Sequence, residues 1–238
     1  MHPVAFVFHA LRSPQNLGAI ARAMNNFGLT ELVLAEPLTY AFGEAEKLAV
    51  KSMDLLDGMR VERSLPAALA PYVFVAGTTS RALPHRPALD GRQLAVRLHA
   101  ERARGPVAVL FGSEKRGLSN AELERCQAVV TLPTRPSQPS INVAQTAAIL
   151  AYELGHTPPV ERAGPPGAPR EQMERLYALM QAVLLDADFL NPQNPDDILD
   201  ELRLWLDRAG PSAREAQLMR DAFRKLQRAC AAARPNRP

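Results

Sequence analysis

The stretch from Val107 to Ser119, VAVLFGSEKRGLS, indicates the fold class of this 238-residue chain. Its first five residues are apolar, as is typical of a strand buried on both faces. Gly112, Ser113 and Glu114 follow directly, and Gly117 comes soon after. Two glycines around an acidic residue at the end of a buried strand indicate close approach of the backbone to another group. The stretch therefore predicts a strand that leads into a ligand-facing loop.

Four other short apolar runs alternate along the chain with stretches of helical spacing. They are Val4–Phe8, Leu32–Ala35, Tyr72–Ala76 and Ala128–Leu132. Strands that alternate with helices predict an α/β fold, with a largely parallel sheet covered by helices on both faces. Ligands of such folds bind at the loops that lead from strands into helices.

Two polar residues stand where helices are predicted to begin. Asn16 precedes an apolar stripe that ends at Gly28, as an N-cap and a C-terminal glycine would. Ser140 precedes the apolar stretch 141–154 and follows a loop stiffened by three prolines, residues 133–139. Capping alone explains either residue taken singly. Capping does not explain why all three junctions, at Asn16, at Glu114 and at Ser140, carry polar side chains. This shared feature favours a common site.

The sequence predicts a second, smaller domain after a linker. Residues 156–170, HTPPVERAGPPGAPR, are too rich in proline and glycine for regular structure. They separate a catalytic domain, 1–155, from a helical domain, 171–238. Helical spacing recurs over 170–187, 195–209 and 212–231, with prolines near the second and third starts.

The composition limits the class of protein without deciding it. The net charge is +3, and 24 of the 28 basic residues are arginine, which suits phosphate recognition but also follows from genome base bias. No apolar run reaches the length of a membrane span and no signal peptide is present, so we expect a cytoplasmic protein. Cys126 and Cys230 lie outside any disulfide or zinc-binding pattern.

Two nucleotide-binding classes fit poorly. The segment 112–119 matches the phosphate-binding pattern GxxxxGK[ST] except at Leu118, where the pattern requires the lysine that holds the phosphates. Glu114 would also repel a triphosphate. A Rossmann-type oxidoreductase is disfavoured because no GxGxxG follows the first strand.

Three segments carry a resemblance to a known family. NLGAIARAM at 16–24, FGSEKRGLS at 111–119 and PSINVAQTAAILAYEL at 139–154 resemble, in order, the three motifs of the SpoU branch of the SPOUT methyltransferases. The C-terminal helices resemble the appendage of the TrmJ-type enzymes, which methylate the ribose of tRNA nucleotide 32. This chain departs from the TrmJ pattern at Ser52 and Met53, where a Gly-Ala pair is usual, and at 218–221.

The resemblance implies a deep trefoil knot, S-adenosyl-L-methionine (AdoMet) as methyl donor, RNA and most specifically tRNA as partner, a homodimer and no metal. The residues that match the cofactor pocket are Thr78, Thr79, Ser80, Gly112, Leu132, Ser140, Ile141 and Asn142. The residues that match the methyl-transfer site are Arg22, Asn16, Glu114, Ser140 and Asn142.

The family mechanism makes the first-motif arginine, here Arg22, the proton acceptor for the ribose hydroxyl. Because a neutral guanidinium is costly, we favour a role for Arg22 in orienting the hydroxyl and an RNA phosphate. Three alternatives stay open: a methyltransferase for rRNA, one for another tRNA position, and an RNA-binding relative that has lost its chemistry.

Overall fold

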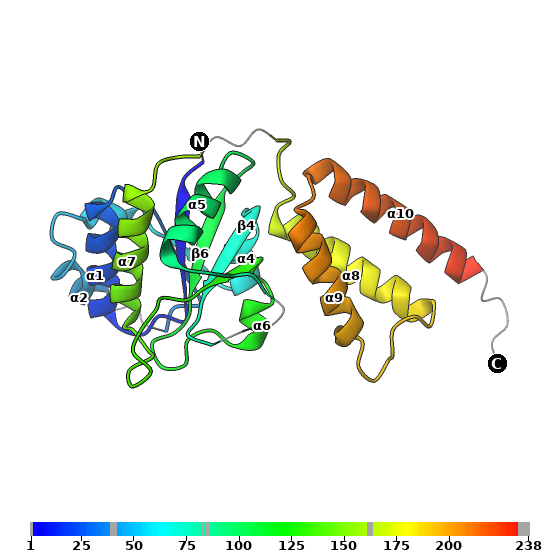
Figure 1. Cartoon of the computed structure of the whole chain (residues 1–238), viewed down its shortest axis with the longest axis horizontal. Helices are drawn as coiled ribbons and strands as arrows, with labels where there is room; N and C mark the ends of the chain where they lie inside the picture. Colours follow the sequence, from blue (N-terminus) through cyan, green and yellow to red (C-terminus); the bar gives the residue numbers. More distant parts are fainter. Residues whose placement is uncertain (1, 39–41, 82, 84–85, 161–163, 233–238) are drawn as a thin grey trace. The chain divides into compact units, whose positions relative to one another are not determined.

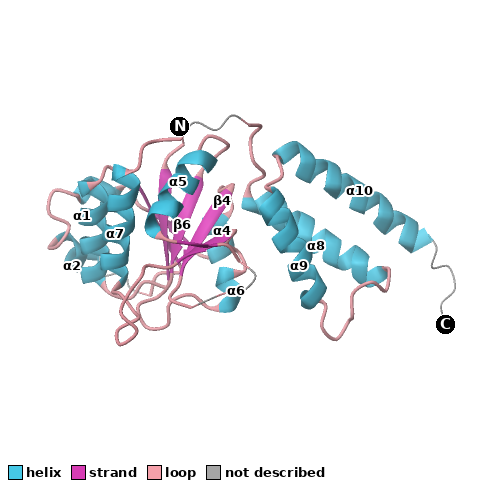
Figure 2. Ribbon diagram, viewed as in Figure 1, coloured by secondary structure: helices cyan, strands magenta, loops and turns pink. Residues whose placement is uncertain are grey.

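The computed structural model describes residues 2–38, 42–81, 83, 86–160 and 164–232. The chain divides into two compact units, residues 1–164 and 165–238. Each unit has its own hydrophobic core, and Figure 1 follows the elements of both along the chain. The first unit holds a parallel seven-stranded sheet with helices on both faces (Figure 2), which confirms the predicted α/β class.

The strand order across the sheet is β3-β2-β1-β6-β4-β7-β5. The strands are β1 (Val4–His9), β2 (Glu31–Ala35), β3 (Arg60–Glu62), β4 (Phe74–Thr78), β5 (Ala88–Leu89), β6 (Val107–Phe111) and β7 (Ala128–Val130). Every pairing between neighbours is parallel. All five predicted strands are present, although β4 begins two residues later than predicted and β7 ends two residues earlier. The edge strands β3 and β5 were not predicted, because two or three residues carry no readable alternation.

Alternation along the strands divides the core between the two faces of the sheet. Phe6, Phe8 and Phe111 face one side, where they pack with apolar residues of four helices. These are α1 (Pro14–Asn26), α3 (Met53–Asp57), α5 (Gly91–Glu101) and α7 (Val143–His156). Val7 and Leu110 face the other side, which α4 (Leu65–Leu69) and the short α6 (Asn120–Leu123) cover. The described residues of this unit also include the short helix α2 (Phe42–Glu46).

Helix α1 begins earlier than predicted. Its N-cap is Ser13, whose hydroxyl accepts a hydrogen bond from the Asn16 N–H, and Pro14 takes the first helical position. The predicted capping role of Asn16 is therefore wrong, and its side chain is left for other partners. At the other end Gly28 has φ of +71°, and Leu29 N donates to Met24 O, so the predicted glycine stop is confirmed.

The described part of the second unit, up to residue 232, holds three helices, as predicted: α8 (Arg170–Asp186), α9 (Asp196–Ala209) and α10 (Ala213–Ala232). Met173, Leu176, Tyr177 and Met180 of α8 are buried between them. Charge is also buried here. The Arg170 guanidinium donates to Asp207 Oδ1 at 2.8 Å, and the Tyr177 hydroxyl donates to the same oxygen at 3.0 Å.

Candidate functional site

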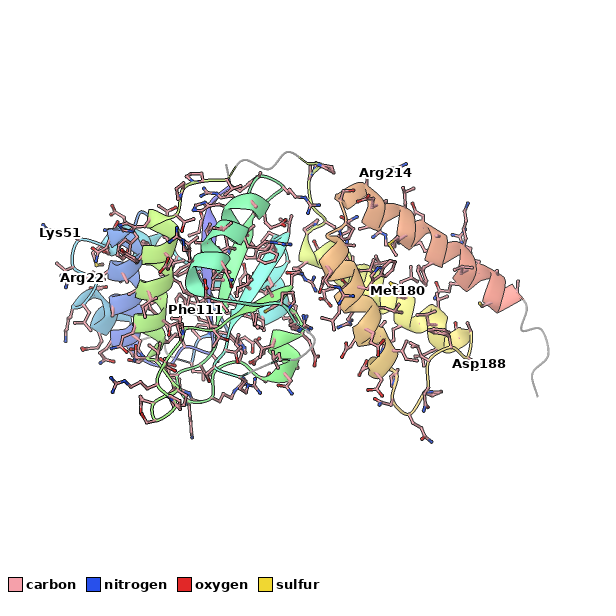
Figure 3. All side chains as sticks on the ribbon, in the orientation of Figure 1. Arg22, Lys51, Phe111, Met180, Asp188 and Arg214 are labelled. Carbon is pink, nitrogen blue, oxygen red and sulfur yellow. The ribbon has the colours of Figure 1, made fainter. Side chains whose placement is uncertain are left out.

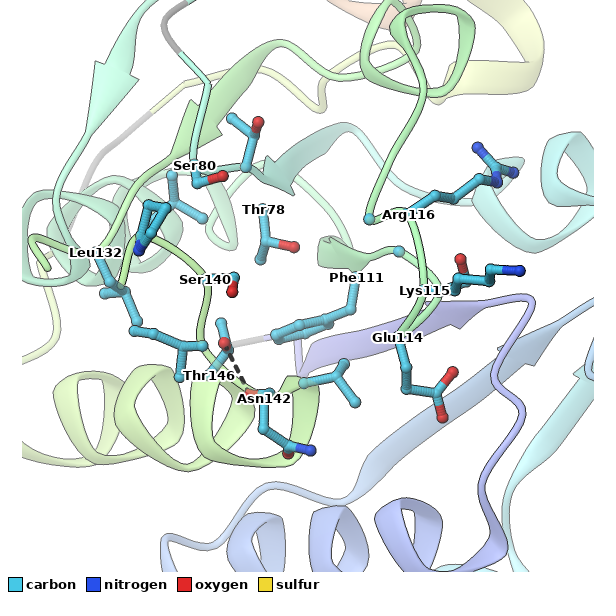
Figure 4. A pocket seen from close by; sticks show the side chains of 18 of the residues that line it. Thr78, Ser80, Phe111, Glu114, Lys115, Arg116, Leu132, Ser140, Asn142 and Thr146 are labelled. Carbon is cyan, nitrogen blue, oxygen red and sulfur yellow. Dashed lines mark hydrogen bonds between the residues drawn. The ribbon is translucent and has the colours of Figure 1, made fainter. Parts of the chain in front are cut away.

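A cavity of about 410 Å³ lies at the carboxyl ends of β4, β6 and β7 (Figure 4). This end of a parallel sheet is where α/β proteins bind ligands, and the volume is within the usual range for ligand pockets. The structure brings to it all eight residues predicted to bind a cofactor: Thr78, Thr79, Ser80, Gly112, Leu132, Ser140, Ile141 and Asn142. Their lining combines hydroxyl groups with apolar side chains.

The loop after β6 forms one wall of the cavity. Gly117 N donates to Ser113 O at 2.8 Å, and Gly117 has φ of +66°, which closes the loop into a tight turn. A Cβ atom on Gly112 would lie 2.1 Å from the Gly117 carbonyl carbon. Gly112 is therefore required by the close approach of the two backbone segments. This is the approach that the sequence predicted, although the neighbour at this point is the loop itself.

Glu114 joins this loop to the start of α1. Its carboxylate accepts hydrogen bonds from the backbone N–H groups of Arg12 and Ser13, the shortest at 2.9 Å. Asn16 Nδ2 donates to the same carboxylate at 3.2 Å, and Asn16 Oδ1 accepts from Asn142 Nδ2 at 3.2 Å. Three predicted site residues from the three motifs thus form one hydrogen-bonded chain, in which Asn16 lies between Glu114 and Asn142.

Asn142, and not Ser140, is the N-cap of helix α7. The Asn142 side chain accepts hydrogen bonds from Ala144 N at 2.8 Å and Gln145 N at 3.4 Å, so the predicted capping position was two residues too early. Thr146 Oγ1 donates to Asn142 O at 3.1 Å and steadies this turn (Figure 4). Ser140 is exposed and lines the cavity, which leaves its hydroxyl directed at whatever binds there.

Arg22 does not line the cavity. It lies on α1 with an exposed side chain, well to one side of Phe111 in Figure 3. Among the described residues its guanidinium has no hydrogen bond or ion pair. Of the five residues predicted for methyl transfer, Glu114, Ser140 and Asn142 line the cavity, Asn16 adjoins it through hydrogen bonds, and Arg22 stands apart.

Several cavity residues were not predicted. They are Phe111, Ser113, Lys115, Arg116, Gly117, Val130, Pro139, Val143, Thr146 and Leu150. Lys115 and Arg116 lie inside the segment 107–119, which predicted a ligand-facing loop, so their place in the sequence was an available signal.

Two wider features of the described residues bear on the class of protein. They contain no cluster of three or more His, Cys, Asp or Glu side chains arranged to hold a metal ion. Within the same residues, no helix combines the length and apolar character that crossing a membrane requires.

Known proteins share both parts of the sequence. Residues 3–152 match the SpoU rRNA Methylase family, and residues 171–236 match the C-terminal domain of the tRNA methyltransferase TrmJ. The tRNA (cytidine/uridine-2'-O-)-methyltransferase TrmJ of Yersinia enterocolitica is 33% identical over 239 residues, which cover 96% of this chain and 93% of the relative. The same enzyme of Cronobacter sakazakii is 32% identical over 223 residues, 89% of this chain and 91% of the relative.

A solved structure also resembles the whole chain. The crystal structure of TrmJ from Z. mobilis ZM4 has a TM-score of 0.83 and 27% sequence identity, and the match covers 95% of this chain and all of that one. The family match extends over more than half of the sequence and includes the segments that form the cavity. This protein therefore belongs to the SpoU rRNA Methylase family and carries a TrmJ-type C-terminal domain.

Proposed function

We propose that this protein transfers a methyl group from AdoMet to a ribose 2'-hydroxyl of tRNA, at anticodon-loop nucleotide 32. The observation that carries the proposal is the cavity, where segments 78–80, 112–117 and 139–146 meet in a member of a methylase family. The relatives named for cytidine and uridine 2'-O-methylation, which match along nearly the whole chain, support tRNA as the substrate class.

The cavity fits AdoMet in its chemistry. Thr78, Thr79 and Ser80 offer hydroxyl and backbone groups for the polar parts of the donor, while Leu132 and Ile141 offer an apolar surface for the adenine ring. The Glu114 carboxylate at the rim supplies negative charge near a sulfonium cation. When bound, AdoMet would supply an electrophilic methyl group.

The residues of this chain would then orient the nucleophile. A ribose hydroxyl is weakly nucleophilic, so alignment with the methyl group and removal of its proton determine the rate. The Ser140 hydroxyl is free to turn toward the substrate at the cavity. Asn142 is held by Asn16, which is held in turn by Glu114, so its position in the cavity wall is set before the substrate binds.

Arg22 requires a second copy of the chain or the RNA itself to meet the substrate, because it lies outside the cavity of its own chain. We favour a homodimer in which Arg22 of one copy serves the cavity of the other. Equal amounts of Arg22→Ala and Gly112→Val chains, each inactive alone, should then recover roughly a quarter of wild-type activity after subunit exchange. Continued inactivity of verified mixed dimers would argue that each cavity uses its own Arg22.

The helical unit is the proposed docking site for the tRNA phosphates. Six arginines of this unit are candidates for this role: Arg203, Arg208, Arg214, Arg220, Arg224 and Arg228. The Arg203 guanidinium lies 5.1 Å from the centroid of the Tyr177 ring, and Arg220 Nη2 donates to Gln217 Oε1 at 2.6 Å, so both are engaged in the fold. The four with exposed side chains are Arg208, Arg214, Arg224 and Arg228. They are the better candidates. Action on tRNA also accords with a cytoplasmic location, which we propose as well.

The decisive experiment is methylation of unmodified tRNA by the purified protein with labelled AdoMet, followed by mapping of the modified nucleotide. We expect ribose methylation of C or U at nucleotide 32. Methylation at another tRNA position, or of rRNA instead, would correct the substrate. AdoMet binding without transfer to any RNA would instead support a relative that has lost its chemistry.

A further inference from the structure

Arg116 contributes to the cavity wall, yet its guanidinium is paired with Glu122 of α6. Arg116 Nη1 donates to Glu122 Oε2 at 3.1 Å, and Nη2 donates to Oε1 at 2.6 Å. Two parallel hydrogen bonds between a guanidinium and a carboxylate fix direction as well as distance. In Figure 4 the Arg116 side chain points away from Thr78 and Ser140. The group is therefore directed at the protein and not at the cavity.

Glu122 is itself held in place from two further directions. Its Oε2 accepts a hydrogen bond from Ser119 N at 2.6 Å, within the capping box that begins α6. Its Oε1 lies 3.1 Å from Nδ1 of the buried His9, at the end of β1. Burial alone would raise the pKa of the Glu122 carboxyl, but the hydrogen bonds from Arg116 and Ser119 outweigh it, and the pKa is lowered.

The loop between β6 and α6 thus has two charged anchors on either side of its exposed tip, Lys115. Glu114 fixes one side of the loop to the start of α1. Arg116 fixes the other side to Glu122. The backbone between these anchors makes the tight approach of Gly117 to Gly112 and lines the cavity.

We propose that Arg116 and Glu122 form a positioning pair that holds the 112–117 loop in the shape that binds the methyl donor. Neither residue contacts the reacting atoms in this assignment, and Arg116 is not a ligand for RNA phosphate. The inference rests on the proposed function, since it takes AdoMet as the occupant of the cavity. It adds Glu122, which lies outside the cavity lining, to the residues on which donor binding depends.

The test compares Arg116→Gln, Glu122→Gln and the double variant. Glutamine at 122 can still accept the Ser119 N–H bond, so α6 keeps its capping box while the charged pair is lost. Each single variant should weaken AdoMet binding about tenfold by calorimetry, and the double variant should be no weaker than the worse single variant. The KM for AdoMet should rise, while tRNA affinity and kcat at saturating AdoMet stay near wild type.

Matched controls are Arg92→Gln and Glu46→Gln, which remove exposed charges of each sign elsewhere in the same unit and should leave AdoMet affinity unchanged. Thermal unfolding of every variant separates lost positioning from lost fold. The inference is overturned by unchanged AdoMet affinity in the variants, by additive losses in the double variant, or by a loss of tRNA affinity confined to Arg116→Gln. Failure of the wild-type protein to bind AdoMet would overturn the proposed function together with this inference.

Discussion

The core of the helical unit and the rim of the cavity in the α/β unit differ in how far their charged side chains are exposed. In the helical unit, the side chains of Arg170 and Asp207 are 4% and 5% exposed and bond each other. In the α/β unit, the charged side chains beside the cavity are partly or fully exposed, as are Glu114 and Lys115. A buried charge needs its partner because desolvation is costly, so it is committed to the fold. An exposed charge at the edge of the sheet, such as Lys115, costs little to leave unpaired, so it is available for a substrate.

The largest effect should follow from Asp207→Ala, which leaves the Arg170 guanidinium buried without its main partner. Burial alone would lower the Arg170 pKa, but Asp207, Tyr177 and Glu174 keep it raised, so the group stays charged. The helical unit should lose about 3–5 kcal/mol of stability, measured by denaturant unfolding. Glu171→Ala, which breaks the exposed pair with Arg175, is the control and should cost less than about 1 kcal/mol. Equal losses would show that burial does not set the cost of losing a charged partner.

Arg22→Ala should lower turnover and leave stability unchanged, which is the reverse of the effect expected for Asp207→Ala. Turnover of tRNA should fall on the order of 10²-fold, because an oriented charge acts mainly in the transition state. Stability and AdoMet affinity should stay at wild-type values, since the side chain is exposed and lies outside the cavity. Steady-state kinetics and calorimetry on the same preparation make the measurement. Wild-type turnover would exclude Arg22 from the chemistry.

A chain that ends at Gly164 should separate binding of the donor from binding of RNA. The α/β unit has its own core, so it should stay folded and bind AdoMet as the whole chain does. Affinity for tRNA should fall about tenfold or more, with a shallower salt dependence, because the phosphate contacts of the helical unit are gone. Filter binding at several salt concentrations tests this. Undiminished tRNA affinity would place the docking surface on the α/β unit.

The smallest effect concerns Glu122, whose pKa is lowered by Arg116 and Ser119 against the effect of its burial. A carboxylate with a lowered pKa stabilises the fold above its unfolded-state pKa and loses that contribution as the pH falls through its folded-state pKa. Glu122→Gln should therefore be less stable than wild type at neutral pH, by less than about 1 kcal/mol because Arg116 is half exposed. The deficit should shrink as the pH falls below the ordinary value of 4.5. A deficit independent of pH would mean that charge is not its source.

The sequence predicted the strands and helices whose apolar residues form a long, regular pattern. Apolar runs such as Val107–Phe111 are long enough to identify a strand, and the stripe on α8 is long enough to identify a helix. It also identified the eight residues that meet at the cavity, through the family resemblance, although only four of them lie inside the three motifs. The short edge strands β3 and β5 lack such runs, since they pair at the border of the sheet with few side chains in the core.

The starts of α1 and α7 were predicted less well, for a physical reason. Several polar residues precede both helices, and the one that caps is decided by where the others find partners. Asn16 bonds to Glu114 and Asn142, which are distant in sequence, so Ser13 caps α1. Arg22 illustrates the same limit, because its position in a motif does not specify whether its side chain reaches the cavity of its own chain.

The placement of β6 has a consequence for how the protein folds. β6 enters the sheet between β1 and β4, which precede it in the chain, and Val4 pairs with Val107. Neither face of the core is complete until this strand arrives, because β6 contributes to both. We therefore expect slow folding, limited by pairings between distant segments. Since Gly112 directly follows β6, the cavity forms in the same late step, so a ligand of the cavity would protect the finished sheet and no earlier state.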